Sequence, residues 1–226
     1  MSYAGNHCAF IFDWDGVIID SHDAHEQSWN QLAEETGQPL PEGFFKASFG
    51  MRNQQIFPRF FTWLDPNNLE AIAKLGDRKE ELYREIIRKT GIEPLPGVRR
   101  LLEQANKKGI PCAIGSSTPR KNIDTIMEII RLDGYFSAIC SAEDVTKGKP
   151  APDIFLRAAE KLNASPKYCI VFEDAHVGIE AGKAAGMKVV AVATTHPMEE
   201  LKADLVLPNL DGVEITSILA LLNPEA

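Results

Sequence analysis

Two aspartates one residue apart, Asp13 and Asp15, follow a short apolar run at residues 9–12. The run is Ala-Phe-Ile-Phe, which predicts a strand buried on both faces. In an open α/β fold, the carboxyl end of such a strand lies at the edge where ligands bind. Neighbouring carboxylates repel each other unless a cation lies between them. The pair therefore indicates a cation site, although Asp15 followed by Gly16 could also form an ordinary turn.

Other polar residues follow apolar runs later in the chain. Ser116 and Ser117 end the run at 110–117, and Glu173 and Asp174 end the run at 168–174. Lys149 lies in a loop before a predicted helix at 152. If the strands are parallel, these carboxylates, hydroxyls and one ammonium converge at one edge of the sheet. Each also has an ordinary explanation, because the serines and acids could cap helices and Lys149 could be a solvated loop residue.

Strands must alternate with helices to bring these residues together. From residue 95 onward, apolar runs alternate with segments of helical periodicity, which predicts an α/β fold with a doubly wound parallel sheet. Between about 20 and 92 the strand signals vanish and helical spacing dominates. We therefore predict a core of residues 1–19 and 93–226, with a small all-helical domain of residues 20–92 inserted after the first strand. Pro58 and Gly76 are expected to bend or break helices of this insertion.

Composition excludes several classes of protein. The 226 residues carry a net charge of −8, which argues against nucleic-acid binding. No apolar run approaches the ~18 residues that span a membrane, and the first residues lack the basic and apolar regions of a signal peptide. The four cysteines form no C-x-x-C pair. We expect a reduced, cytoplasmic protein that acts on a small molecule. The oligomeric state stays open, with a monomer plausible.

Four segments resemble the four motifs of the haloacid dehalogenase superfamily, in order. They are FDWDGV, AIGSST, KGKPAPDIF and VFEDAHVGIEAGKAAG. The resemblance spans about residues 8–222, and the helical insertion falls where one branch of the superfamily carries its cap domain. It implies a Rossmann-like core, a helical cap that closes over the site and, in most members, phosphoryl transfer.

The resemblance also implies a role for each polar residue. Asp13 would be a nucleophile that forms an aspartyl-phosphate, and Asp15 a general acid and base. The residues expected to hold the phosphoryl group are Ser116, Ser117 and Lys149. Those expected to hold Mg²⁺ are Asp13, Asp15 through its backbone carbonyl, Asp174 and Glu173. Dehalogenases of this superfamily lack an acid at the Asp15 position, so Asp15 points to phosphate esters.

The insertion resembles the cap of β-phosphoglucomutase and its phosphatase relatives. His25 and Lys79 fall on mutase cap positions that work near the sugar or its phosphate, although either could be an ordinary surface residue. Asn53 stands where the mutase has a substrate-binding arginine, and Pro119–Arg120 replaces a Lys-Asn pair. Arg52 and Arg120 could still provide a distal anion site.

The expected function is a Mg²⁺-dependent phosphatase acting on a small phosphorylated metabolite such as a sugar phosphate. One alternative is a β-phosphoglucomutase-like phosphosugar isomerase, which the departures at Asn53 and Arg120 disfavour. An alternative of another class is a non-catalytic binding or regulatory protein on the same fold. The complete set of Asp13, Asp15, Lys149 and Asp174 argues against it, because a scaffold would not need that set.

Overall fold

The computed structural model describes residues 8–48 and 51–222. The chain divides into two compact units, residues 1–20 with 92–226 and residues 21–91. We call them unit 1 and unit 2 and describe each by itself. That unit 2 acts as a substrate-selecting cap stays a prediction.

Unit 1 contains a six-stranded parallel sheet in the order β3-β2-β1-β4-β5-β6. Its strands are β1 (Ala9–Phe12), β2 (Cys112–Gly115), β3 (Ala138–Cys140), β4 (Cys169–Glu173), β5 (Lys188–Val192) and β6 (Leu205–Leu207). In the register of the central strands, Phe12 lies opposite both Ile114 and Phe172. The residues that follow β1, β2 and β4 therefore leave the sheet at one edge, which is the geometry that the sequence predicted.

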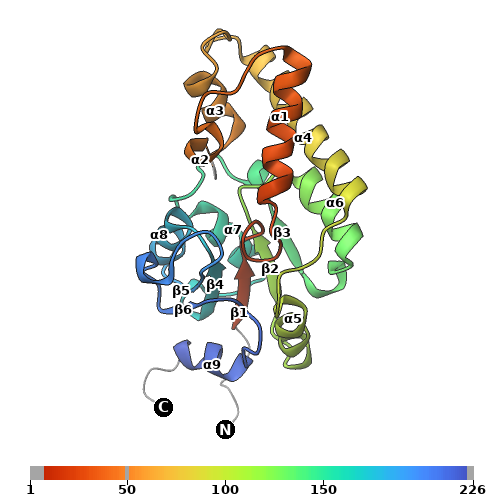
Figure 1. The fold of residues 1–226 in the computed structure, drawn as a ribbon. Helices are drawn as coiled ribbons and strands as arrows, with labels where there is room; N and C mark the ends of the chain where they lie inside the picture. Colours follow the sequence, from red (N-terminus) through yellow and green to blue (C-terminus); the bar gives the residue numbers. More distant parts are fainter. Residues whose placement is uncertain (1–7, 49–50, 223–226) are drawn as a thin grey trace. The chain divides into compact units, whose positions relative to one another are not determined.

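Helices cover both faces of this sheet (Figure 1). The α-helices of unit 1 are α5 (Val98–Lys107), α6 (Arg120–Ile130), α7 (Asp153–Lys161), α8 (His176–Ala184) and α9 (Ile215–Leu219). Unit 1 also contains the short 3-10 helices η1 (Asp133–Tyr135), η2 (Ala142–Asp144), η3 (Pro166–Tyr168), η4 (Met198–Glu200) and η5 (Ala220–Leu222). On the face under α7 and α8, Ile11 and Val171 pack with Phe155 in one buried cluster. Phe12 stacks on Phe172 with ring centroids 4.4 Å apart. The predicted doubly wound sheet is confirmed.

The chain leaves unit 1 after Asp20 and returns to it at Ile92. The two crossing segments are bonded to each other, because Ile19 bridges to Pro94 and the backbone N–H of Leu95 donates to the carbonyl of Ile18 at 2.8 Å. The insertion therefore starts and ends at neighbouring points of unit 1.

The regular secondary structure in the described part of unit 2 is all helical. Its helices are α1 (His22–Thr36), α2 (Phe44–Ser48), α3 (Asn53–Phe60) and α4 (Leu69–Thr90). Its core is aromatic, with Trp29 packed against Phe44, Phe57 and Phe61.

The sequence predicted that Pro58 and Gly76 bend or break helices of unit 2, and no break occurs at either residue. Helix α3 continues through Pro58, and α4 continues through Gly76. A glycine inside a helix costs about 1 kcal/mol, which the packing of a long amphipathic helix outweighs. At Gly76 an added Cβ would lie 3.5 Å from the Cβ of Asn53, which is an ordinary van der Waals contact, so α3 packs against α4 at this position without requiring a glycine.

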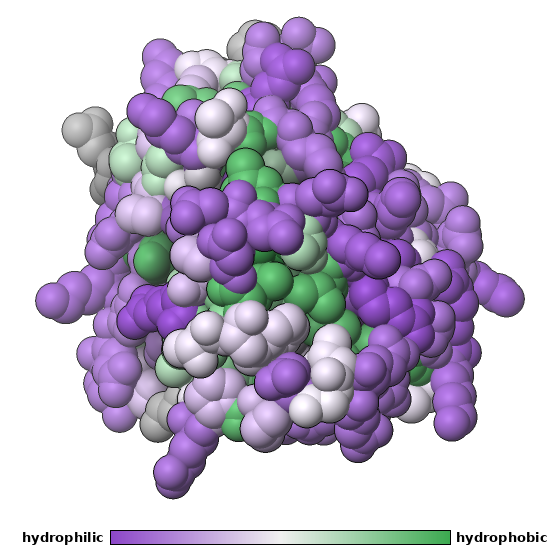
Figure 2. All heavy atoms as spheres, turned by 90° about the horizontal axis from the view of Figure 1, so that it is seen from above, coloured by the Kyte–Doolittle hydropathy of each residue, from purple (hydrophilic) through white to green (hydrophobic). Residues whose placement is uncertain are grey.

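The exposed side chains are mostly polar. Hydrophilic residues dominate the face shown in Figure 2. No helix in the described ranges is both long enough and apolar enough to cross a bilayer. The four cysteines are free thiols, and burial raises the pKa of Cys112 to about 12.

Candidate active site

The site begins at the end of the central strand. The backbone N–H of Asp13 donates to the carbonyl of Phe172 at 2.9 Å, so the pairing of β1 with β4 extends one residue past β1. Trp14, fully buried, separates Asp13 from Asp15. At Gly16 the backbone has a φ of +77°, which a side chain rarely adopts, and the chain turns. Strand pairing therefore fixes Asp13, and the turn fixes Asp15.

Lys149 joins two carboxylates that come from different strands. Its Nζ lies 2.9 Å from Oδ1 of Asp13 and 2.6 Å from Oε1 of Glu173. The Lys149 side chain is buried. Burial alone would lower the pKa of Lys149, but the two carboxylates hold that pKa above its ordinary value. Lys149 is therefore a charged ammonium within contact of Asp13, not a solvated loop residue.

Glu173 is completely buried, and both of its carboxylate oxygens have partners. Oε1 accepts from Lys149, while Oε2 accepts from the backbone N–H groups of Asp174 and Ala175, each at 2.8 Å. Burial raises the pKa of Glu173. The helix that follows approaches closely, since a Cβ on Gly178 would lie 1.7 Å from Oε1 of Glu173. Glu173 is thus held as the fixed partner of Lys149.

Burial and neighbouring charges both act on the carboxyl group of Asp174. Its pKa is raised well above the ordinary value by burial and then by the charges of Glu173 and Asp13. The hydroxyl of Thr195 donates to Oδ2 of Asp174, and a Cβ on Gly16 would lie 2.0 Å from the same oxygen. One ligand atom each from Asp13, Glu173 and Asp174 lies within 4.8 Å of the others. Three crowded carboxylates beside one ammonium fit a divalent cation, which would relieve their repulsion.

The loop after β2 supplies hydroxyl groups. Ser116 is buried, its backbone N–H donates to the carbonyl of Cys140 at 3.0 Å, and its Oγ donates to Oγ1 of Thr118 at 3.2 Å. The hydroxyl of Thr118 in turn donates to Oδ2 of Asp15. The structure thus links β2 to the second aspartate, while Ser117 lies half-buried beside them in the same loop.

Thr118 and Thr195 contact the site aspartates and were missed from the sequence. Thr118 directly follows the two serines that were chosen, and Thr195 lies just past the apolar run at 187–194, whose end was not examined for polar residues. Extending the strand-end rule to every predicted strand would have found Thr195.

Arg120, also in unit 1, lies at the start of α6 and is half exposed. Its Nε donates to Oδ1 of Asp124 at 2.7 Å, and its backbone N–H donates to Glu143. The guanidinium is therefore bound by a carboxylate of its own helix.

Two candidate residues of unit 2, His25 and Lys79, contact each other. Lys79 is buried, with Nζ 2.7 Å from Nδ1 of His25 and 3.1 Å from Oε1 of Glu80. The ring of His25 stacks on that of Tyr83 with centroids 4.1 Å apart. An ammonium can only donate, so Nδ1 of His25 accepts and the imidazole is neutral. Burial, followed by the charge of Lys79, lowers the pKa of His25 to about 3. Lys79 is thus buried and its partner His25 is partly buried, so neither is an ordinary surface residue.

Arg52 and Asn53, at the start of α3, differ in the hydrogen bonds that their side chains make. The side-chain amide of Asn53 donates to Oε1 of Glu80 at 2.8 Å. The Nε and Nη2 atoms of Arg52 are buried and have no hydrogen-bond partner among the described residues. Arg52 therefore offers two sheltered donors, which suits an anion.

Comparison with known proteins identifies the family. The model of the haloacid dehalogenase-like hydrolases matches residues 9–186. The chain belongs to this family. The match spans the strand ends that carry the haloacid dehalogenase site, from Asp13 to Asp174.

Three relatives show the range of activities in this haloacid dehalogenase branch. A 5-amino-6-(5-phospho-D-ribitylamino)uracil phosphatase of Arabidopsis thaliana is 36% identical over 95% of this chain, which spans 58% of the length of that plant protein. A phosphorylated carbohydrates phosphatase of Thermotoga maritima is 30% identical over 86% of this chain and 88% of its own. A β-phosphoglucomutase of Bacillus subtilis is 36% identical over 88% of each chain.

A solved structure matches both units of the chain. The family IA haloacid dehalogenase hydrolase of Entamoeba histolytica covers 96% of this chain and 99% of its own, with a TM-score of 0.86 and 30% identity. The protein is therefore a haloacid dehalogenase-type enzyme, and relatives of it are named phosphatases.

Replacing Gly178 with alanine tests the close approach of α8 to Glu173. An alanine in a helix is ordinarily stabilising relative to glycine. Here the new Cβ would displace Glu173 and break its pair with Lys149, so we expect the free energy of unfolding to fall by about 3 kcal/mol and activity to be lost. Urea unfolding checks the first effect. Gly134→Ala is the control, because nothing lies within 4 Å of its added Cβ. Equal stability of the Gly178→Ala protein and the wild type would contradict the geometry.

The lowered pKa of His25 predicts a pH dependence of stability. In the unfolded chain His25 binds a proton below a pKa of about 6.5, whereas in the folded protein its pKa is about 3. Stability from this residue is therefore present above pH 6.5 and is lost as the pH falls toward 3. Between pH 7 and pH 5 the loss is about 2 kcal/mol in the free energy of unfolding.

Urea unfolding of the His25→Gln variant at both pH values measures this term. The variant should lose about 2 kcal/mol less than the wild type between pH 7 and pH 5. Asn30→Gln on the same helix is the control, because Asn30 is exposed and carries no ionisable group, so the wild-type pH dependence should be unchanged. Identical pH dependence in the wild type and His25→Gln would show that His25 titrates normally in the folded protein.

Proposed function

We infer that the protein is a Mg²⁺-dependent phosphatase that releases inorganic phosphate from a small phosphorylated metabolite such as a sugar phosphate. The observation that carries this inference is the position of Asp13, which lies within contact of the Lys149 ammonium and close to Asp174, with a second acid at Asp15. Family membership and relatives named phosphatases support the same reaction.

Asp13 is the proposed nucleophile. Its carboxylate attacks the phosphorus, displaces the alcohol and forms an aspartyl-phosphate. Attack by an anion on an anionic ester is opposed by about 4 kcal/mol per charge pair at 4 Å in an effective dielectric near 20. The ammonium of Lys149, 2.9 Å from Asp13, offsets part of that repulsion. Hydrogen bonds from Ser116 and from the backbone near Ser117 would hold the phosphoryl oxygens.

Asp15 is the proposed general acid and base. As an acid it gives a proton to the departing alcohol oxygen, and as a carboxylate it then takes a proton from the water that hydrolyses the aspartyl-phosphate. Thr118 donates to Oδ2 of Asp15 and so helps to fix the orientation of the carboxyl group.

The residues proposed to hold the cation are Asp13, the backbone carbonyl of Asp15, and Asp174. Haloacid dehalogenase phosphatases generally use a divalent metal, and Mg²⁺ prefers such oxygen ligands together with substrate phosphates. When bound, Mg²⁺ supplies positive charge that offsets the repulsion between the carboxylates and the phosphate. Glu173 assists by holding Lys149, since both of its oxygens already accept hydrogen bonds.

The substrate class rests on the relatives and on unit 2. Two relatives act, by their names, on a phosphorylated ribityl compound and on phosphorylated carbohydrates. We propose that Arg52 binds an anionic or hydroxyl-rich part of such a substrate through its sheltered donors. The His25–Lys79 pair and Arg120 remain proposed substrate residues, although Arg120 would first have to release Asp124.

A β-phosphoglucomutase-like isomerase is the second candidate, favoured by the 36% identical relative of that name. A mutase must hold a second phosphate in either orientation. At the positions where the mutase resemblance places substrate contacts, Asn53 is bound to Glu80 and Arg120 to Asp124. Asn53 carries no charge and Arg120 is already paired with an acid, so these two positions offer fewer cations for a second phosphate, which favours the phosphatase.

Phosphate release from a panel of sugar and other small phosphate esters, with Mg²⁺ and with chelator, tests the proposal. We expect Mg²⁺-dependent release from at least one ester. Conversion of β-glucose 1-phosphate to glucose 6-phosphate with a bisphosphate primer, without phosphate loss, would favour the isomerase. Ester binding without either reaction would favour a non-catalytic binding protein. A cytoplasmic location stays a prediction.

A further inference from the structure

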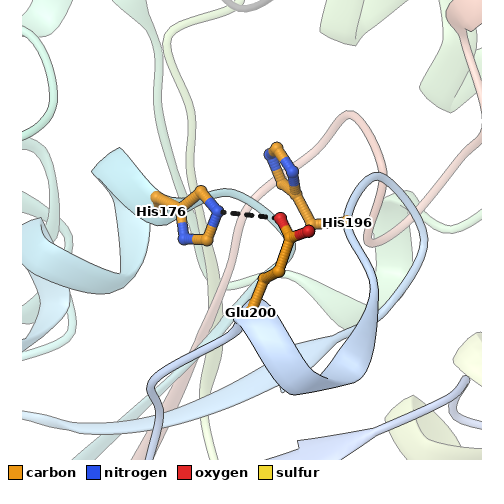
Figure 3. A group of neighbouring side chains, drawn as sticks. All are labelled: His176, His196 and Glu200. Atoms are coloured by element: carbon orange, nitrogen blue, oxygen red, sulfur yellow. Dashed lines mark ion pairs between the residues drawn. The ribbon is translucent and has the colours of Figure 1, made fainter.

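Two histidines and a glutamate lie together in unit 1 and share no residue with the three-carboxylate site. His176 is the first residue of α8, His196 lies in the loop after β5, and Glu200 ends η4. Figure 3 shows the Glu200 carboxylate extending toward both imidazole rings. The ring centroids are 4.4 Å apart, and Nε2 of His176 lies 3.9 Å from Oε2 of Glu200. The three residues thus bring two ring nitrogens and a carboxylate oxygen toward one point.

The distances suit a small metal ion. One ligand atom from each residue lies within 4.8 Å of the others. Around a tetrahedral zinc ion with bonds of about 2.0–2.1 Å, the ligand atoms would be about 3.3 Å apart. Because His176 and Glu200 are about half exposed, small side-chain rotations can close the difference.

The ligand types select a different ion from that of the carboxylate site. Imidazole nitrogens suit zinc, nickel and copper, whereas Mg²⁺ is bound by oxygens. Two histidines and a glutamate also leave a fourth position open to water.

We propose that His176, His196 and Glu200 form a second cation site that binds a zinc-class transition-metal ion. Two of these residues are connected to Asp174. His176 follows Asp174 by two residues, and His196 follows Thr195, whose hydroxyl donates to Asp174. An ion bound there joins the start of α8 to the loop after β5, the two segments that surround Asp174.

Equilibrium dialysis of the full-length protein against Zn²⁺, with Mg²⁺ saturating, tests the proposal. The wild type should bind one equivalent of Zn²⁺ more than the His176→Ala/His196→Ala variant. Competition with a chromogenic chelator should show Glu200→Gln to bind at least about tenfold more weakly, since even indirect partners of metal ligands matter by that factor. His22→Ala is the matched control, because it disrupts the exposed group His22, Asp23 and Glu26 and should keep the extra equivalent.

Equal zinc stoichiometry and affinity in the wild type and the double variant would overturn the proposal, as would loss of the extra equivalent in His22→Ala. A second measurement does not depend on the double variant folding. In the wild type, Zn²⁺ should shift the ring proton NMR signals of His176 and His196 and leave those of His22 unchanged. Shifts at His22 without shifts at His176 and His196 would overturn it as well.

Discussion

The Asp13→Asn variant should release phosphate at least about 10⁴-fold more slowly than the wild type on every substrate, because the amide cannot form an aspartyl-phosphate. The change keeps the size of the side chain, and the hydrogen bond from the backbone of Asp13 to Phe172 does not depend on the carboxylate. The Lys149–Glu173 pair also remains. The fold should therefore survive, and the loss should appear in kcat.

Single-turnover assays on purified protein measure this effect directly. The wild type should become phosphorylated on Asp13, and the variant should not. Asp133→Asn is the control, since Asp133 is an exposed acid in η1 and should leave turnover unchanged. Turnover by Asp13→Asn within tenfold of the wild type would remove Asp13 as the nucleophile.

The Lys149→Met variant should lose about 3–5 kcal/mol of unfolding free energy in the presence of chelator. Lys149 is the ammonium that pairs with Asp13 and Glu173, so its removal leaves two buried carboxylates without a counter-charge. Added Mg²⁺ should restore part of the stability by supplying positive charge at the same carboxylates. Urea unfolding with chelator and with Mg²⁺ measures both effects.

Two further variants separate this effect from the general loss of an ion pair. Lys161→Met removes an ion pair with Asp144 whose N–O distance, 2.7 Å, is similar to those of Lys149 but which is more exposed. This change should lower the free energy of unfolding by at most about 1 kcal/mol. Lys149→Met/Glu173→Gln removes both buried charges and should be more stable than the sum of the two single changes implies. A Lys149→Met protein as stable as the wild type in chelator would show that the buried carboxylates are protonated without Lys149.

Sequence reasoning was strong where a local rule applied. A buried parallel strand must deliver its next residues to one edge of the sheet, so Asp13, Ser116 and Asp174 could be placed together before any coordinates were known. The contacts between side chains could not be predicted in the same way. That Lys149 bridges Asp13 and Glu173, or that Thr118 binds Asp15, depends on rotamers and on loop paths that no periodicity encodes.

Prediction from the sequence was weakest where tertiary packing outweighs the local propensity of a residue. Gly76 is a weak helix former, but α4 is held along its length by its neighbours and continues through it. For His25 and Lys79 the question of exposure stayed open, because polar side chains on helices gave no local reason to expect that Lys79 is buried against His25. Such burial follows from the aromatic residues around them, Trp29 and Tyr83, which lie elsewhere on the same two helices.

The bridge between Ile19 and Pro94 has a consequence for how such a protein can change over generations. Because the inserted segment leaves and re-enters unit 1 at neighbouring residues, doubling its length adds only about 0.6 kcal/mol to the free-energy cost of closing the loop. An exchange of the gene segment that encodes residues 21–91, with one junction at each end, can thus replace the whole insertion and leave every strand in its order. Under the roles proposed above, such an exchange would keep the chemistry of unit 1 and change the selectivity that unit 2 provides.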